Sequence, residues 1–178
     1  RLVEGGRALA RLFGTDGIRG RANRWPLTAP FLLKLGQAVA QVIGDEGEAR
    51  PRVVIGRDPR RSGAMLESAL AAGLMSQGVD VMRAGVIPTP GVAYLTRTHQ
   101  AQLGIVISAS HNPFDHNGVK IFGADGFKVP DETEMEIERL LLDDEIEFEG
   151  ADPTDVGRSI WADDWRQDYV DHLVDAWD

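Results

Sequence analysis

Cysteine is absent from all 178 residues of the sequence. This absence excludes a disulfide framework, zinc sites built on thiolates and thiol catalysis, and it agrees with a reducing environment. The sequence also has no apolar run near the roughly 20 residues that a membrane-spanning helix needs, and its opening residues, RLVEGG, lack both Met and the apolar stretch of a secretory signal. We therefore expect a soluble, cytoplasmic protein with no membrane partner.

Basic residues are in the minority, 19 against 28 acidic ones, and the formal net charge is −9 at pH 7. Taken alone, this charge argues against a nucleic-acid partner. The charge is distributed unevenly, however. Residues 1–130 contain 16 basic and 10 acidic side chains, a balance of +6, whereas residues 131–178 contain 3 basic and 18 acidic ones, a balance of −15. The basic part of the chain is where we expect an anionic ligand.

Hydrophobic periodicity predicts alternating helices and strands through the basic part of the chain. Helices are expected over 28–43, 62–75 and 91–98, and strands over 52–56, 79–84 and 103–107. Thr28 and Ser62 are the expected N-caps of the first two helices. The resulting β-α-β-α-β order predicts an α/β fold, with a mixed, mostly parallel sheet sandwiched between helices.

The segments after residue 107 predict an edge to this sheet and a second, unfinished domain. A hairpin over 119–122 and 127–129 would form an antiparallel edge, and Asp131 with Glu134 matches a helix-capping box. The acidic segment 143–155 is typical of a linker. On one face of a last helix from about Asp163 lie apolar residues that nothing later in the sequence covers: Trp165, Tyr169, Leu173, Val174 and Trp177. We therefore divide the chain into a domain at 1–150 and, at 151–178, a linker with the first helix of a truncated second domain.

The loop after the buried strand 103–107 is the first candidate site, because ligands of parallel α/β sheets bind at the carboxyl ends of strands. It reads SASHNP (residues 108–113) and offers Ser110 as a nucleophile and several donors to phosphate. The alternative is a polar surface loop with an Asx turn at Asn112. A serine hydrolase is disfavoured, because the neighbouring Ser110 and His111 should point in different directions and no Gly-x-Ser-x-Gly motif is present.

Two glycine- and arginine-containing turns are weaker candidates. In FGTDGIRGR (residues 13–21), glycine allows backbone N–H groups to face an anion and Arg19 can grip phosphate, but a structural turn fits equally well. In GRDPRRS (residues 56–62), a helix cap with an Arg–Asp ion pair is the favoured interpretation over a phosphate site.

Lys120 lies between apolar Val119 and Ile121, where partial burial would lower its pKa toward a value useful in acid–base chemistry. The alternative is a lysine of an edge strand whose ammonium group reaches into solvent. A metal site formed by His111, Asp115 and His116 is disfavoured, because the sequence lacks zinc-ligand spacing.

Three motifs together resemble the α-D-phosphohexomutase superfamily, in its order and spacing. They are FGTDGIRG (residues 13–20), ISASHNP (107–113) and NGVKIF (117–122), and the resemblance runs from about residue 12 to residue 142. The first motif and the Ser108-Ala109 pair are similar to the glucosamine branch of the superfamily. The resemblance implies that residues 1–150 form the family's first domain.

The resemblance also implies a reaction and a set of site residues. Ser110 would carry a phosphoryl group and donate it to glucosamine 6-phosphate, and the 1,6-bisphosphate would reorient and return its other phosphoryl group, leaving glucosamine 1-phosphate for UDP-N-acetylglucosamine and cell-wall precursors. Arg19 and Lys120 would stabilise the transferring group or move protons. His111 would be a further catalytic residue and would hold the loop together with Asn112. Ser108 and Asn112 would belong to the loop that meets the substrate and its phosphate, and a Mg²⁺ ion would bind the phosphate of Ser110.

The sequence departs from the family in lacking three loops that lie after the first domain: the Asp-x-Asp-Gly-Asp-Arg magnesium loop, the sugar-specificity loop and the phosphate-binding loop. Family members are longer and have four domains. The resemblance therefore implies an N-terminal fragment, inactive alone, whose partners are a phosphosugar and the remaining domains of the same protein. Two alternatives stay open: a phosphoglucomutase or phosphomannomutase, and a non-catalytic phosphosugar-binding domain.

Overall fold

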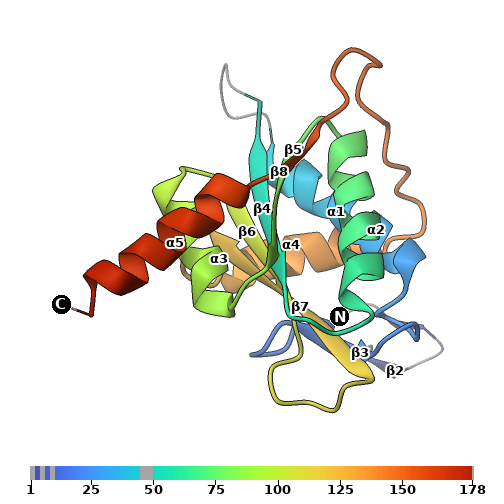
Figure 1. Ribbon diagram of the computed structural model, residues 1–178. Helices are drawn as coiled ribbons and strands as arrows, with labels where there is room; N and C mark the ends of the chain where they lie inside the picture. The colour runs from blue at the N-terminus through green and yellow to red at the C-terminus, as the bar shows by residue number, and fades with distance from the viewer. Residues whose placement is uncertain (1–2, 5–6, 9–10, 45–49, 178) are drawn as a thin grey trace.

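The computed structural model describes residues 3–4, 7–8, 11–44 and 50–177 and has a six-stranded sheet at its centre, with helices on both faces (Figure 1). The sheet order is β3-β7-β6-β4-β5-β8. Its strands are β3 (Ile18–Arg21), β4 (Arg52–Arg57), β5 (Asp80–Val86), β6 (Leu103–Ile107), β7 (His116–Gly123) and β8 (Ser159–Trp161). The helices are α1 (Ala29–Ile43), α2 (Gly63–Ser76), α3 (Thr89–Thr98), α4 (Asp131–Leu142) and α5 (Asp163–Asp175). A separate antiparallel pair comprises β1 (Val3–Glu4) and β2 (Arg7–Ala8).

Strand directions confirm the predicted mixed, mostly parallel α/β sheet. β4 pairs in parallel with both β5 and β6, and β8 pairs in parallel with β5. β7 runs antiparallel to β6 on one side and to β3 on the other. The crossover helices α2 and α3 each connect one parallel strand to the next, as a βαβ unit requires.

The predicted edge of the sheet is wrong. β7 is an interior strand. The returning segment of the predicted hairpin forms no strand and joins β7 through an isolated bridge between Phe122 and Lys128 and two backbone hydrogen bonds beside it. On this side the sheet ends at β3, which comes from the glycine- and arginine-containing motif at residues 13–21. That motif is too short and glycine-rich to give a strand signal by itself.

Two apolar cores lie on the two faces of the sheet. On one face, α1, α2 and α4 pack over the inward side chains of the strands, including Val53, Ile55, Ile105 and Val119. On the other face, α3 and α5 cover Val54 and Val106 (Figure 1). Alternating strand residues therefore enter different cores, as the two-residue period of a strand requires. Among the helices in the described ranges, none combines the length and the apolar character needed to cross a bilayer.

Helix caps follow the sequence prediction at α1 only. The Thr28 hydroxyl accepts a hydrogen bond from the Phe31 amide at 3.4 Å, and α1 has a proline in its first turn. Ser62 precedes α2 but makes no capping bond, because its backbone is helical (φ −71°, ψ −18°) and not extended as a capping residue requires. Its hydroxyl accepts from the side chain of Asn117 instead. The predicted capping box at α4 is also wrong. Pro130 is the N-cap, and the buried Glu134 pairs with Arg11 and Lys128 instead.

The C-terminal segment adds a strand and a helix to this fold. β8 extends the sheet beside β5, and just before it Arg158 pairs with the buried Asp80 at 2.6 Å. Burial acts to raise the pKa of Asp80, but hydrogen bonds and the charge of Arg158 outweigh it and hold that pKa below its usual range. On α5, Tyr169 is buried against α3, whereas Trp177 is 92% exposed. The division of the chain at residue 150 stays a prediction.

Helices α1 and α2 approach closely at two glycines, Gly36 and Gly73, and a Cβ atom at Gly73 would lie 2.1 Å from the carbonyl oxygen of Leu33. We expect Gly73→Ala to lower the free energy of unfolding by about 1–3 kcal/mol, because a backbone clash cannot be relieved by rotating a side chain. This loss comes despite the higher helix propensity of alanine. Urea unfolding followed by circular dichroism measures it.

Gly150→Ala is the matched control, because the nearest atom to its new Cβ would be the Ser76 carbonyl oxygen at 3.6 Å, an ordinary contact. Equal unfolding midpoints for the two variants would show that the α1–α2 approach is looser than described.

Candidate functional site

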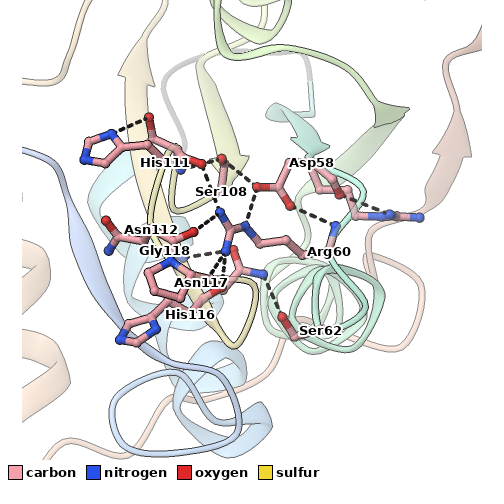
Figure 2. A network of polar contacts seen from close by, with 12 residues as sticks. Asp58, Arg60, Ser62, Ser108, His111, Asn112, His116, Asn117 and Gly118 are labelled. Atoms are coloured by element: carbon pink, nitrogen blue, oxygen red, sulfur yellow. Dashed lines mark hydrogen bonds and ion pairs between the residues drawn. The ribbon is translucent and has the colours of Figure 1, made fainter.

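The predicted serine loop connects β6 to β7 and is folded back on itself at the carboxyl end of β6. The Ser108 amide donates to the carbonyl oxygen of Gly118 at 3.0 Å, so the two ends of the loop lie side by side. Inside the loop, the Asn112 amide donates to Ala109 and the His116 amide to Pro113, each at 3.0 Å. Figure 2 shows the polar network that surrounds this loop.

Ser110 presents its side chain to solvent from a strained backbone position. Its φ of +55° is in the left-handed region, which residues other than glycine rarely adopt. The Ser110 amide donates to the Ser108 hydroxyl at 3.0 Å, and that hydroxyl donates to Asp58 at 2.8 Å. Ser108 is therefore a structural bridge, and Ser110 has the exposed hydroxyl of the pair.

The expectation that Ser110 and His111 point apart is wrong, because Ser110 Oγ lies 3.4 Å from His111 Nδ1. The contact is long for a hydrogen bond to a hydroxyl. In the described part of the chain, no carboxylate forms an ion pair or hydrogen bond with His111, so no third group orients the imidazole. The arrangement is not a Ser-His-Asp triad.

Pairing of β3 with β7 brings Arg19 and Lys120 to the same face of the sheet. Arg19 is in register with Gly118, and Lys120 lies two residues further along β7. A Cβ atom at Gly118 would lie 3.0 Å from Arg19 Cγ and 2.7 Å from the Ser108 carbonyl oxygen. The arginine stem thus crosses β7 next to the start of the serine loop, and only glycine leaves room for it there.

Asp16 joins these two basic residues. Its carboxylate lies 3.1 Å from Lys120 Nζ and 3.5 Å from the Arg19 guanidinium. Gly17 makes this turn possible, because its φ is +78° and a Cβ atom there would lie 2.1 Å from the Val119 carbonyl oxygen. The hydrogen bond and charge of Lys120, with smaller effects from Arg19 and His111, hold the pKa of Asp16 below its usual range. Lys120 therefore has a carboxylate partner and lies on an interior strand, not the predicted alternative of an edge strand.

Asn112 and Asn117 hold the loop in different ways. Asn112 acts through its backbone, and no hydrogen bond of its side chain is found in the described ranges, so the Asx turn is wrong. Asn117 is fully buried. Its amide group donates to the Ser62 hydroxyl and its side-chain oxygen accepts from the Gly118 amide, each at 2.9 Å. These bonds tie the end of the loop to the start of α2.

The loop does not assemble a metal site. His116 Nδ1 lies 3.0 Å from Asp115, which also pairs with Arg21 at 3.0 Å. Across the described residues, no group of three or more His, Asp or Glu side chains is placed to hold a metal ion. Two further carboxylates beside this region, Asp16 and Asp58, are both paired with cations.

Sequence reasoning missed three residues that the structure brings to this site: Asp16, Asp58 and Arg60. An Arg–Asp ion pair was predicted in this turn, and it exists between Arg60 and Asp58 at 2.9 Å, but the contact of Arg60 with the serine loop was not predicted. The order of the strands in the sheet could have predicted this contact. β4 and β6 are parallel neighbours, so the turn after β4 must lie beside the loop after β6.

The known proteins that this chain matches belong to one family. Residues 10–147 match the model for "phosphoglucomutase/phosphomannomutase, alpha/beta/alpha domain I". The chain is 55% identical over 172 residues to a phosphoglucosamine mutase of Corynebacterium efficiens, covering 94% of this chain and 38% of that protein. It is 51% identical over 162 residues to one of Cereibacter sphaeroides, covering 91% of this chain and 36% of that protein.

A solved structure shares the fold. It is a phosphoglucomutase/phosphomannomutase family protein from Burkholderia thailandensis, with a TM-score of 0.74 and 28% identity over 92% of this chain and 35% of that one. The chain thus spans a little over a third of the length of the relatives that it matches.

The Asp16–Lys120 pair predicts how the site responds to pH. Because the pKa of Asp16 is lowered, the pair is intact at neutral pH and is lost only when the pH falls through that lowered value. We expect Lys120→Met to raise the pKa of Asp16 toward the ordinary value. Carbon-13 NMR titration of the Asp16 carboxyl group in the 178-residue chain measures this shift.

Lys128→Met is the control, because Lys128 pairs with Asp131 and Glu134 and not with Asp16. An Asp16 carboxyl group that titrates identically in wild type and Lys120→Met would contradict the pairing.

Proposed function

The chain belongs to the phosphoglucomutase/phosphomannomutase family, and we propose that it carries the phosphoserine of an enzyme that interconverts glucosamine 6-phosphate and glucosamine 1-phosphate. One observation carries the proposal. An exposed serine hydroxyl is held in the loop at the carboxyl end of a central strand, and the next two strands of the sheet, β7 and β3, carry a lysine and an arginine that share Asp16. The names of the two phosphoglucosamine mutases compared above favour glucosamine as the sugar.

The proposed reaction has two transfers through Ser110. Phosphoserine 110 gives its phosphoryl group to the O1 oxygen of glucosamine 6-phosphate, the Ser110 hydroxyl re-forms and the sugar becomes a 1,6-bisphosphate. The sugar then reorients, and its O6 phosphoryl group moves to Ser110 Oγ and leaves glucosamine 1-phosphate. Phosphoryl transfer depends on positioning and on neutralising charge more than on covalent assistance, which explains a nucleophile without a catalytic triad.

The basic residues have separate proposed roles in these steps. Arg19 and Lys120 share Asp16 in the resting site, so their positive charges are already held in place when a phosphoryl group arrives. They would then stabilise the transferring group, and Lys120 is the residue able to give or take a proton. His111, 3.4 Å from Ser110 Oγ, would hydrogen-bond the serine oxygen, and Ser108 and Asn112 hold the loop.

Mg²⁺ is the proposed cofactor, but the described residues do not form a site for it. Ser110, once phosphorylated, is the one oxygen ligand that we assign to this chain, since Asp16 and Asp58 are engaged. Mg²⁺ on the phosphate would neutralise charge in the transfer. We propose that its other ligands lie in further domains of the same protein, which also bind the phosphosugar, and that the protein works in the cytoplasm without nucleic acid or membrane partners.

Removal of the nucleophile tests the proposal most simply. In the full-length protein, we expect Ser110→Ala to reduce mutase turnover by at least about 10,000-fold, because no other group can carry the phosphoryl intermediate. A coupled assay of glucosamine 1-phosphate formation measures it. Ser159→Ala, at an exposed position on β8, is the matched control with normal turnover. Full activity in Ser110→Ala would remove the assignment.

Substrate preference separates the sister activities. We expect kcat/KM of the full-length enzyme to be highest for glucosamine 6-phosphate among the 6-phosphates of glucosamine, glucose and mannose. A preference for glucose or mannose would assign a phosphoglucomutase or phosphomannomutase instead. No turnover of any of the three would favour a phosphosugar-binding domain.

The 178-residue chain by itself should be inactive in the same assay, because no three His, Asp or Glu side chains among its described residues are grouped to hold a metal ion. Measurable turnover by this chain would contradict the proposal that other domains complete the site.

A further inference from the structure

The turn between β4 and α2 lies against the serine loop. β4 and β6 are parallel neighbours, and the Asp58 amide donates to the Ile107 carbonyl oxygen at 3.1 Å. This contact continues the sheet pairing one residue beyond the strands. It places Arg60, a residue of the turn for which the sequence predicted only an Arg–Asp ion pair, directly beside residues 110–116.

Arg60 uses every hydrogen-bond donor of its guanidinium group on this site. Nε donates to Asp58 at 2.9 Å. One terminal nitrogen donates to the carbonyl oxygens of Ser110 at 2.9 Å and Asn112 at 2.8 Å, and the other donates to those of Pro113 and His116, the latter at 3.0 Å. A guanidinium has five N–H donors, and here five acceptors surround it (Figure 2). Three of these acceptors are carbonyls of the serine loop, and a fourth is the carbonyl of His116 at the start of β7.

Asp58 connects this arginine to the conformation of Ser110. One of its carboxylate oxygens accepts from both Arg60 Nε, at 2.9 Å, and the Ser108 hydroxyl, at 2.8 Å. The Ser108 hydroxyl in turn accepts from the Ser110 amide at 3.0 Å. The backbone of Ser110 is therefore held on both sides of its Cα atom: Ser108 holds its amide and Arg60 holds its carbonyl.

These bonds oppose a backbone preference. Ser110 has a φ of +55°, a conformation that persists for residues other than glycine only when the surroundings over-determine it. Rotation of the Ser110 backbone to an ordinary φ would break the bond of its carbonyl to Arg60 or that of its amide to Ser108. The direction of the Ser110 side chain depends on that backbone angle.

We propose that Arg60, aligned by Asp58, is a positioning residue that fixes Ser110 in the left-handed conformation from which its hydroxyl meets the transferring phosphoryl group. This proposal rests on the proposed function for its catalytic consequence. Arg60 does not contact the phosphoryl group, because all of its donors are engaged and its side chain is only 12% exposed. It acts through the loop.

The chemistry of the guanidinium explains why lysine should not replace it. A lysine ammonium has three donors on one atom, whereas the acceptors here lie around a planar group on three nitrogens. Arg60→Lys retains the charge and loses the geometry. The neighbouring Arg61 is exposed, and its side chain makes no hydrogen bond or ion pair within the described residues, so it offers a matched control.

The kinetic test uses the full-length enzyme with Arg60→Lys, Arg60→Met and Arg61→Met. We expect kcat to fall about 100-fold in both Arg60 variants, the cost of a misplacement near 1 Å, with KM for the phosphosugar within about threefold of wild type. Arg61→Met should match wild type in kcat. A kcat for Arg60→Lys near that of wild type would overturn the proposal, and so would a loss confined to KM.

The conformational test does not depend on activity. In the 178-residue chain, NMR chemical shifts of the Ser110 Cα and Cβ atoms should report a left-handed backbone in wild type and in Arg61→Met, and an ordinary one in Arg60→Lys. If wild type has the left-handed shifts but the full-length enzyme turns over no phosphosugar, the proposed function fails and the positioning role of Arg60 stands. Left-handed shifts in Arg60→Lys would contradict the role of Arg60 whatever the activity.

Asp58→Asn keeps the test decisive if the Arg60 variants do not fold. It retains the size of the side chain and removes the charge that aligns Arg60, so we expect the same fall in kcat at smaller amplitude and a partial shift of the Ser110 signals. Unchanged kcat and unchanged Ser110 shifts in Asp58→Asn would overturn the proposed alignment.

Discussion

The site depends on the five hydrogen bonds that the Arg60 guanidinium donates. A loop that folds back between two antiparallel strands leaves carbonyl oxygens that no ladder satisfies, and each needs a donor. The guanidinium of Arg60, whose side chain is 12% exposed, supplies donors to three of them, those of Ser110, Asn112 and Pro113, and to the carbonyl of His116 at the start of β7. The loop can then hold a serine in a conformation that its own backbone disfavours. Hydrogen bonds from the neighbouring turn between β4 and α2 make the loop rigid, and the Ser110 side chain contributes none of them.

The positive charges near Ser110 are likewise held in place before a ligand binds. Arg19 and Lys120 come from two antiparallel strands and are held together by Asp16. Arg60 instead donates to Asp58 and, through its terminal nitrogens, to backbone carbonyls. Positive charge is thus present beside Ser110 and fixed in direction before any phosphoryl group binds. The acidic residues after position 130 lie mainly on α4, the segment after it and α5, away from the serine loop in the chain.

Much of this fold was predictable from the sequence, and the exceptions have physical causes. The strands and helices between residues 28 and 107 have strong periodicity, and the Ser110 loop follows from its place after a buried strand. β3 and β8 are four and three residues long, and their pairing depends on strands distant in the chain. Serine is a residue type that commonly caps helices, but the hydroxyl of Ser62 accepts a hydrogen bond from Asn117, a tertiary contact that the sequence does not reveal. The role of Arg60 was hidden because its partners are backbone carbonyls, which carry no side-chain signature.

The central claim is that this loop holds Ser110, and not the adjacent Ser108, as the phosphoryl acceptor. Full-length protein treated with a hexose 1,6-bisphosphate and digested with trypsin yields one peptide, residues 98–120, that contains both serines. Fragmentation mass spectrometry assigns the phosphate within it. We predict phosphate on Ser110 alone, because the Ser108 hydroxyl is held between Asp58 and the Ser110 amide. Phosphate on Ser108, or none in this peptide, would contradict the account.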